Sequence, residues 1–350
     1  MPNISDLKIA VVGAGLIGRK HVDLVTRHAR LSAIIDPDPK VRDLAVELGA
    51  AWFNSLEACL SDHRPDGAIV ASPNQLHLDH GTTCLKSGLP VLIEKPLADT
   101  AEAARTLAEM SDAIGTPILV GHHRRHSPVI DSARAIIAEG LLGQLVTVNA
   151  MFWLNKPDDY FDVEWRRQPG GGPTYINLIH DIDLLQYLCG PITHVQAREA
   201  SAVRGFDVED TSAVILEFKS GMLGTVSISD AVSAPWSWEL TAGENPAYPQ
   251  TDQSCYTLGG TKAALSIPDM RVWTHTGTQS WWSPIESERL DIQTTDPVEA
   301  QFLHFLDVIN GTVEPRVTGW DGLRNIEVLD AIKLAASRGN RQTVGGTGGS

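Results

Sequence analysis

Three glycines stand in a GxGxxG pattern near the start of the chain, between an apolar run and an amphipathic stretch. The run Leu7–Val12 suits a buried parallel strand, and Gly13, Gly15 and Gly18 follow it at the turn into a helix. In such a turn the first glycine permits the tight bend, the second lets the backbone approach a pyrophosphate, and the third lets the helix pack closely on the strand. The amides that open the helix favour phosphate charge. The pattern predicts a dinucleotide site on a parallel α/β sheet.

An acidic residue closes the next apolar run, Leu31–Ile35. Asp36 follows Gly18 by eighteen residues, close to the spacing of a carboxylate that accepts hydrogen bonds from the adenosine ribose. This carboxylate would repel a 2′-phosphate, and residues 37–39 include no base. We therefore expect NAD as the cofactor, with NADP less favoured. The expected contacts in this segment are Gly13, Gly15, Leu16, Ile17, Gly18 and Asp36.

Short apolar runs alternate with helical patterns up to about residue 121, which predicts parallel βαβ units and a doubly wound Rossmann sheet. Ligands of such sheets bind beyond the carboxyl ends of the strands. The strand ends after 67–71, 90–93 and 118–121 are therefore candidate sites. They add Ser72, Pro73, Asn74, His77, Glu94 and Lys95 to the expected cofactor contacts.

The second part of the chain has a different pattern. Longer β-rich segments at 145–154, 194–202, 212–218, 222–228 and 236–242 predict a large, mostly antiparallel open sheet, with helices at 176–188 and 298–308. We expect an NAD-binding domain over 1–123, a substrate-binding and oligomerisation α/β domain over 124–343, and a flexible tail over 344–350. The fold class is α/β.

Composition excludes several classes of protein. The net charge of −15 argues against sequence-independent nucleic-acid binding, which depends on Lys and Arg. No apolar run is long enough to span a bilayer, and the first residues lack a signal-peptide pattern. The four cysteines are scattered, which favours reduced thiols and a cytoplasmic location.

Lys95 is the first residue with a candidate chemical role. It lies in an EKP segment just past an apolar strand, where the nicotinamide is expected. An ammonium there can bond to a substrate oxygen and stabilise its developing charge. The alternative is a surface lysine on a loop.

A second candidate site follows a GGG run at 170–172, which gives a flexible approach to a helix. Asn177 and His180 share a face of that helix. Histidine titrates near neutrality and can take an alcohol proton as hydride leaves the same carbon. Asn177, Asp181 or Asp183 offers an orienting partner, whereas the alternative is a histidine buried in the core.

The segment HHRRH at 122–126 permits two uses. His122 and His126 are four residues apart, but no convincing carboxylate or thiolate joins them, so we predict no metal site. Arg124 or Arg125 could instead clamp a substrate carboxylate. The alternative is that these arginines pair with acidic side chains.

Together the segments VVGAGLIG, SPNQLH, EKP, GGG…HDID and DGLRNIEVLDAI resemble the glucose-fructose oxidoreductase / inositol dehydrogenase (Gfo/Idh/MocA) family over nearly the whole chain. The resemblance implies a Rossmann domain followed by a domain with a large open sheet, which often mediates dimers or tetramers. It also implies NAD(P)-linked chemistry on sugars, polyols and related ring alcohols. By motif match, Lys95 resembles the family's catalytic lysine and His180 its catalytic histidine.

One position departs from the family pattern. The family commonly places an Asp four residues before the histidine, where this chain has Ile176. We therefore assign His180 as the general base, Lys95 as the polarising group and Asn177 as an orienting residue. From their positions in the sequence, the expected substrate contacts are Lys95, Arg124, Tyr160, Trp165, Arg166, Asn177, His180 and Trp236.

These observations predict an NAD-dependent dehydrogenase or reductase of a sugar, cyclitol or related polyhydroxylated ring, acting as a homodimer or homotetramer. Three alternatives remain open. The substrate is a carboxylated ring alcohol or dihydrodiol, the NAD stays bound and is recycled, or the protein is a sensor on the same fold.

Overall fold

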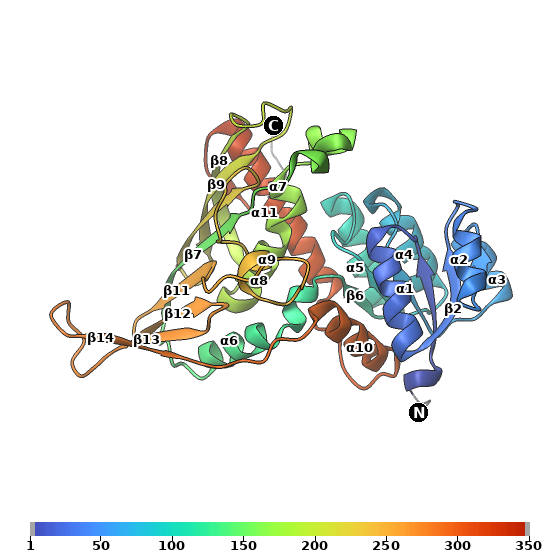
Figure 1. Ribbon diagram of the computed structural model, residues 1–350, viewed down its shortest axis with the longest axis horizontal. Helices are drawn as coiled ribbons and strands as arrows, with labels where there is room; N and C mark the ends of the chain where they lie inside the picture. The colour runs from blue at the N-terminus through green and yellow to red at the C-terminus, as the bar shows by residue number, and fades with distance from the viewer. Residues whose placement is uncertain (1–3, 347–350) are drawn as a thin grey trace. The chain divides into compact units, whose positions relative to one another are not determined.

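The computed structural model describes residues 4–346. The chain forms two compact units, each with its own sheet and core (Figure 1). One unit comprises the chain through Arg125 together with Pro297–Ile326, and the other comprises His126–Asp296 and the chain from Glu327 on. This division differs from the expected single boundary at 123/124, because helix α10 (Pro297–Ile309) contributes Phe302, Phe305 and Leu306 to the first core.

The first unit is built on a six-stranded sheet of order β3-β2-β1-β4-β5-β6, in which every paired strand is parallel. This order is that of a Rossmann fold and confirms the predicted doubly wound sheet. The strands are β1 (Lys8–Val12), β2 (Arg30–Ile35), β3 (Ala51–Phe53), β4 (Gly67–Val70), β5 (Val91–Ile93) and β6 (Ile118–Val120). The helices are α1 (Leu16–His28), α2 (Val41–Glu47), α3 (Leu56–Asp62), α4 (His77–Lys86), α5 (Ala101–Ile114) and α10.

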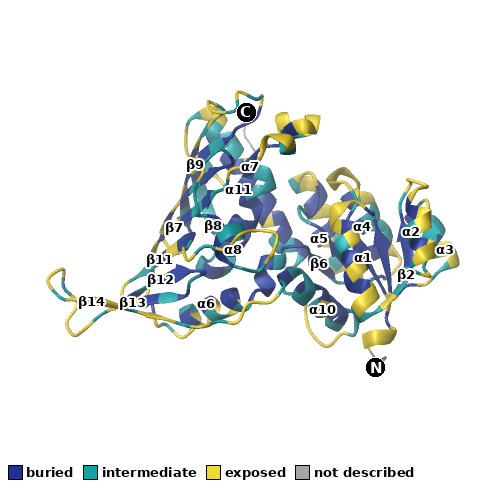
Figure 2. Cartoon of the chain, in the orientation of Figure 1, coloured by how far each residue is buried: buried dark blue, intermediate teal, exposed yellow. Residues whose placement is uncertain are grey.

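Local sequence signals explain where these elements begin and end. Helix α5 begins after Thr100, whose hydroxyl accepts a hydrogen bond from Ala103 N, and it ends at Gly115, which adopts φ +75°. Strands β1, β4, β5 and β6 are buried on both faces along almost their whole length, which explains their uninterrupted apolar runs (Figure 2). Strand β3 was missed because three half-buried residues are too few to make a pattern.

The second unit is built on a nine-stranded sheet of order β14-β13-β12-β11-β7-β10-β9-β8-β15. Only β7 and β10 pair in parallel among its described strands, so the predicted mostly antiparallel sheet is confirmed. The strands are β7 (Leu145–Trp153), β8 (Ile192–Ala200), β9 (Thr211–Phe218), β10 (Leu223–Ser229), β11 (Tyr256–Gly260), β12 (Ala263–Ile267), β13 (Arg271–His275), β14 (Ile285–Arg289) and β15 (Gln342–Thr343). The helices are α6 (Pro128–Ala138), α7 (Pro173–Ile176), α8 (Leu178–Cys189), α9 (Trp238–Thr241) and α11 (Gly319–Arg338), whose first residues belong to the first unit.

The strand predicted at 236–242 is wrong. Residues Trp238–Thr241 form the short helix α9, and the Ser237 hydroxyl accepts a hydrogen bond from Leu240 N at its start. Serine is a preferred residue at this position. The apolar side chains Trp238 and Ala242 are buried one helical turn apart, not on one face of a strand.

Helices α6 and α8 lie against one face of the nine-stranded sheet (Figure 1). On strands β9 and β10 the core residues alternate with exposed ones, which include Ile215, Leu223 and Thr225. The sheet therefore has one face in the core and one face open to the surroundings of this chain.

The C-terminal tail was predicted over 344–350. Residues 347–350 lie outside the described residues, whereas Val344 N donates a hydrogen bond to Thr193 O beside strand β15. Over residues 4–346, no helix is long and apolar enough to cross a bilayer. Cys59, Cys84, Cys189 and Cys255 are free thiols.

Candidate functional site

The glycine-rich turn after β1 has three glycines with three different surroundings. Gly13 adopts φ +92°, and a Cβ atom built on it would lie 2.7 Å from Ala71 O. A Cβ on Gly18 would lie 2.0 Å from Gly13 O, so this glycine is required for close packing of α1 on the turn. A Cβ on Gly15 meets nothing within 4 Å. Only the middle glycine therefore faces open space, which fits the approach of a pyrophosphate.

The surroundings of this open space fit a dinucleotide. Gly15 is the N-cap of α1, and no side chain caps that helix end, so its first amides remain available to phosphate oxygens. Leu16 is 94% exposed although it is apolar, and Ile17 is also exposed. Both side chains were predicted to contact the nucleotide, and their exposure leaves them accessible to a ligand.

Asp36 is connected directly to the glycine turn. Its Oδ2 accepts a hydrogen bond from Ala14 N at 2.8 Å, and its Oδ1 accepts one from Asp38 N at 2.9 Å. The carboxylate is half-buried, and each oxygen keeps a second lone pair for a ribose hydroxyl. The backbone bonds thus orient the carboxylate that the sequence predicts as the ribose contact.

The loop after β4 is tied to the loop after β5 by His77. Its Nδ1 lies 2.8 Å from Pro96 O and its Nε2 lies 2.9 Å from Ser72 O. The His77 side chain is fully buried, so it holds the two loops together and has no surface with which to touch a nucleotide. Ser72 Oγ also lies 2.9 Å from His80 Nδ1.

Lys95 follows β5 at the carboxyl edge of the sheet, and its neighbour Glu94 is buried. Glu94 Oε1 lies 2.7 Å from His21 Nε2 on α1, and its Oε2 accepts a hydrogen bond from Lys95 N. Burial raises the pKa of Glu94, but the hydrogen bond from His21 and the nearby positive charges outweigh it, so this pKa lies below its usual value. The backbone of Lys95 is thereby held by an ionised carboxylate.

Four residues of the HHRRH segment are buried, and His123 is half-buried. Burial, together with the charge of Arg124, lowers the pKa of His123 to about 3, so this histidine is neutral near pH 7. Arg125 is 4% exposed and its Nη2 lies 3.5 Å from Asp321 Oδ1 within the first unit. Arg124, predicted to contact substrate, is 3% exposed. Among residues 4–346, no group of three His, Cys, Asp or Glu side chains could hold a metal ion.

In the second unit, Asn177 separates α7 from α8 and is the N-cap of α8. His180 lies one turn further along α8, is 7% exposed, and donates its backbone N–H to Asn177 O at 3.1 Å. Asp181, predicted as one possible orienting partner, accepts a hydrogen bond from the buried Tyr256 hydroxyl. Asp181 therefore binds a core tyrosine.

A pocket of about 440 Å³ within the second unit brings two of the predicted residues together. Asn177 and Tyr160 both line it, and burial raises the pKa of Tyr160, which keeps the phenol protonated near neutral pH. Arg166 lies beside them, with its guanidinium 4.0 Å from the centre of the Tyr160 ring and its Nη1 donating to Tyr160 O. The remaining lining residues are Leu154, Asn155, Lys156, Pro157, Ser233, Ala234, Leu240, Tyr248 and Pro249.

Lys156 is the most notable residue of this pocket that sequence reasoning missed. Its Nζ lies 3.4 Å from Asp230 Oδ2 and 4.8 Å from the centre of the Tyr160 ring. Asp230 also pairs with Arg204 at 3.0 Å. Burial lowers the pKa of Lys156, although the charge of Asp230 opposes that shift. The signal available in the sequence was a lysine three residues after the end of strand β7.

The predicted aromatic contacts have different surroundings. Trp165 is 52% exposed and borders no pocket described above. Trp236 packs edge-to-face on Trp153, with ring centres 5.5 Å apart, and its Nε1 donates to Gln253. Trp238 is a core residue stacked on Tyr256.

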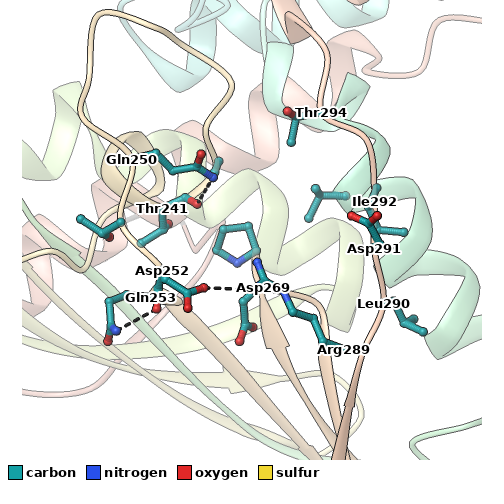
Figure 3. A pocket seen from close by; sticks show the side chains of 14 residues that line it. Thr241, Gln250, Asp252, Gln253, Asp269, Arg289, Leu290, Asp291, Ile292 and Thr294 are labelled. Carbon is teal, nitrogen blue, oxygen red and sulfur yellow. Dashed lines mark hydrogen bonds and ion pairs between the residues drawn. The ribbon is translucent and has the colours of Figure 1, made fainter.

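A second pocket of about 330 Å³ lies elsewhere in this unit (Figure 3). It is bordered by an ion pair between Asp252 and Arg289 at 3.1 Å and by Asp269. None of the predicted site residues lines it, so the Asn177 pocket is the better candidate.

Comparison with known proteins agrees with this arrangement. Residues 7–122 match the oxidoreductase family with an NAD-binding Rossmann fold, and residues 130–266 match the GFO/IDH/MocA C-terminal domain. An inositol 2-dehydrogenase of Corynebacterium glutamicum is 25% identical over 90% of each chain. A 2,7-anhydro-N-acetylneuraminate hydratase of Escherichia coli is 28% identical over 68% of this chain and 65% of its own length.

Among solved structures, the WlbA dehydrogenase of Bordetella pertussis, in complex with NADH and UDP-GlcNAcA, has the same fold. It is 22% identical with a TM-score of 0.77, over 97% of this chain and 98% of that one. The parallel sheet, the glycine turn and the two family matches lead to one conclusion. This chain is a member of the Gfo/Idh/MocA family of oxidoreductases and carries its NAD-binding Rossmann domain.

Proposed function

We propose that this protein is an NAD-dependent dehydrogenase of a hydroxyl group on a sugar, cyclitol or related polyhydroxylated ring. The observation that carries the proposal is the pocket in the second unit, which is lined by Asn177, Tyr160 and Tyr248. Asn177 is the N-cap of α8, the helix that contains His180. The relative that is an inositol 2-dehydrogenase supports the same substrate class.

Oxidation of the hydroxyl group needs a base that accepts its proton and a positively charged side chain beside its oxygen. His180 accepts the proton of the hydroxyl group, because a histidine can be neutral at working pH. The Lys95 ammonium bonds to the same oxygen and stabilises its developing negative charge. Bound NAD supplies the hydride acceptor. Asn177 orients either the ring or His180, since an amide cannot take the proton of an acid–base relay.

The pocket lining suits a ring with polar edges. Tyr160 and Tyr248 offer aromatic surface and hydroxyl donors, and Asn155, Ser233 and Asn177 offer further hydrogen-bonding groups. Leu154, Leu240 and Pro157 contribute apolar surface for the faces of the ring. Trp165 and Trp236 remain predicted substrate contacts.

The redox-neutral alternative has one observation in its favour. A relative is named as a hydratase, and a net hydration leaves the oxidation state of the cofactor unchanged. Steady release of NADH from the wild-type protein supports the dehydrogenase. Conversion of an anhydro-sugar with no net NADH supports the hydratase. The alternative of a carboxylated substrate loses support at Arg125. This arginine was one of the two expected to clamp a substrate carboxylate, but it is paired with Asp321.

We further propose a homodimer or homotetramer formed through the open face of the nine-stranded sheet. Ile215 and Leu223 are exposed there on neighbouring strands. A substitution of both by Lys should yield monomers in sedimentation experiments. The cytoplasmic location remains a prediction, to be checked by cell fractionation.

The test of the function is nicotinamide reduction with NAD or NADP against sugars, inositols, anhydro-sugars, lactols and hydroxylated ring acids. We expect Lys95→Ala and His180→Ala each to lower kcat by about 10²–10⁴-fold while NAD binding persists. Lys86→Ala, at an exposed helix end, is the matched control. Near-normal turnover in both site variants would remove the assignment of these residues. NAD binding without turnover on any substrate favours the sensor.

A further inference from the structure

Two glycines of the GGG run, Gly171 and Gly172, are closely packed, in contrast to the flexible approach expected from the sequence. Gly170 adopts φ +92°. A Cβ on Gly171 would lie 2.4 Å from Trp165 O, and a Cβ on Gly172 would lie 2.4 Å from Glu209 Oε1. Each of the three positions therefore requires glycine for a steric or conformational reason. Two of these glycines are in close contact with other parts of the unit.

Glu209 is the partner that occupies the space beside Gly172. Its side chain is 2% exposed, its Oε1 accepts a hydrogen bond from Thr174 N at 3.1 Å, and its Oε2 lies 2.8 Å from Lys333 Nζ. The carboxylate thus binds an early backbone amide of α7, which has no partner within the helix.

Lys333 on α11 joins this carboxylate to a second one. Glu199 Oε2 also lies 2.8 Å from Lys333 Nζ, and Glu199 Oε1 accepts a hydrogen bond from the Thr174 hydroxyl. Burial lowers the pKa of Lys333, but hydrogen bonds to both carboxylates raise it above its usual value. Burial and the neighbouring Glu209 raise the pKa of Glu199, although the hydrogen bond from Lys333 opposes that shift. Two acidic side chains that share one lysine in a largely buried place are a costly way to stabilise a fold.

The contacts of this cluster extend to both walls of the Asn177 pocket. On one side α7 is followed by its C-cap residue Asn177, which lines the pocket. On the other side Gly171 packs on the backbone of Trp165 and Arg166, and Arg166 is stacked on Tyr160, another lining residue. A shift of the GGG run would displace both walls together.

We propose that Glu209 is a positioning residue for the substrate pocket, which it aligns through Gly172 and Thr174 with Lys333 as its counter-charge. This inference rests on the proposed function, because it assumes that the Asn177 pocket receives the substrate. Glu209 acts through the backbone of other residues and does not contact the ring.

The test compares Glu209→Gln and Gly172→Ala with the wild type in the full-length protein. Assays are run well below the Tm of each variant, so that loss of stability alone leaves kcat and KM unchanged. We expect kcat/KM for the ring substrate to fall at least tenfold, while the Kd for NAD changes less than twofold. Glu217→Gln, which removes an exposed ion pair to Arg341 in the same unit, is the matched control. A lower Tm with unchanged kcat and KM overturns the proposal.

A double variant tests the steric link directly. Glu209→Asp shortens the side chain by one methylene and retracts the carboxylate from the new Cβ of Gly172→Ala. The kcat/KM of the double variant should be at least threefold higher than that of Gly172→Ala alone. If the two substitutions instead lower kcat/KM independently of each other, the proposal is overturned. If the wild type turns over no substrate, the proposed function fails. The coupling is then measured as the Tm of the four proteins, and additive Tm changes overturn the link.

Discussion

His21 Nε2 and Glu94 Oε1 lie 2.7 Å apart in the interior of the first unit. His21 belongs to the helix that follows the glycine turn, and Glu94 precedes Lys95. A Cβ on Gly121 would lie 2.8 Å from Glu94 Oε2, so the end of β6 also depends on this carboxylate. The pair thus links the proposed phosphate-binding helix with the loop of the proposed polarising lysine.

Replacement of His21 by Leu should destabilise the first unit and weaken NAD binding. The change removes a partner from a buried carboxylate, which costs about 3–5 kcal/mol in comparable pairs.

The pKa of Glu94 is depressed in the folded state, so the stability it contributes is present above the unfolded pKa and is lost as the pH falls through the folded pKa. Urea unfolding at pH 7 and pH 4 measures this. His21→Gln keeps a donor and should recover part of the loss, whereas equal stability of all three proteins contradicts the role of the pair.

Alanine substitutions in the glycine turn should separate folding from cofactor binding. Gly18→Ala places a Cβ against Gly13 O and should lower the free energy of unfolding by about 1–3 kcal/mol. Gly15→Ala meets no protein atom within 4 Å, so it should keep the Tm and lower NAD affinity at least tenfold. Thermal unfolding and NAD titration distinguish the two. Normal NAD affinity in Gly15→Ala would show that the pyrophosphate does not approach this residue.

Asp36→Ala should shift cofactor preference. Removal of the carboxylate ends its repulsion of a 2′-phosphate and its bond to the ribose. We expect the ratio of kcat/KM for NADP to that for NAD to rise at least tenfold. Asp38→Ala is the control, because its exposed carboxylate accepts only from Lys40 N among the hydrogen bonds described for it. The same ratio in both variants would place the cofactor selectivity elsewhere.

Much of the first unit could be predicted because its signals are local. The apolar strands, the glycine spacing and the Thr100 cap each lie within a few residues of the element that they specify. The boundaries of the two units were harder to predict from the sequence, because Phe302 and Phe305 of α10 join a core formed by residues far earlier in the chain.

The surroundings of the site depend on contacts between distant residues. Glu209 binds Thr174 across 35 positions, and no periodic pattern connects them. Tyr248 and Ser233 reach the Asn177 pocket from irregular loops. The sequence predicted Asn177 and Tyr160, which both line the pocket, but the other residues that shape it follow from the fold alone.

His123 should make the stability of the protein depend on pH below neutrality. Burial lowers its folded pKa to about 3, whereas the ordinary value is 6.5. Between these values the unfolded chain binds a proton that the folded chain does not, so stability decreases as the pH falls, by at most about 1.4 kcal/mol per pH unit from this group. His123→Gln removes the titration and should flatten the plot of unfolding free energy against pH from 6.5 down to 4. Urea unfolding at four pH values measures the slopes, with His275→Gln in the second unit as the control. Parallel plots for wild type and His123→Gln would show that His123 is protonated in the folded protein as readily as in the unfolded one.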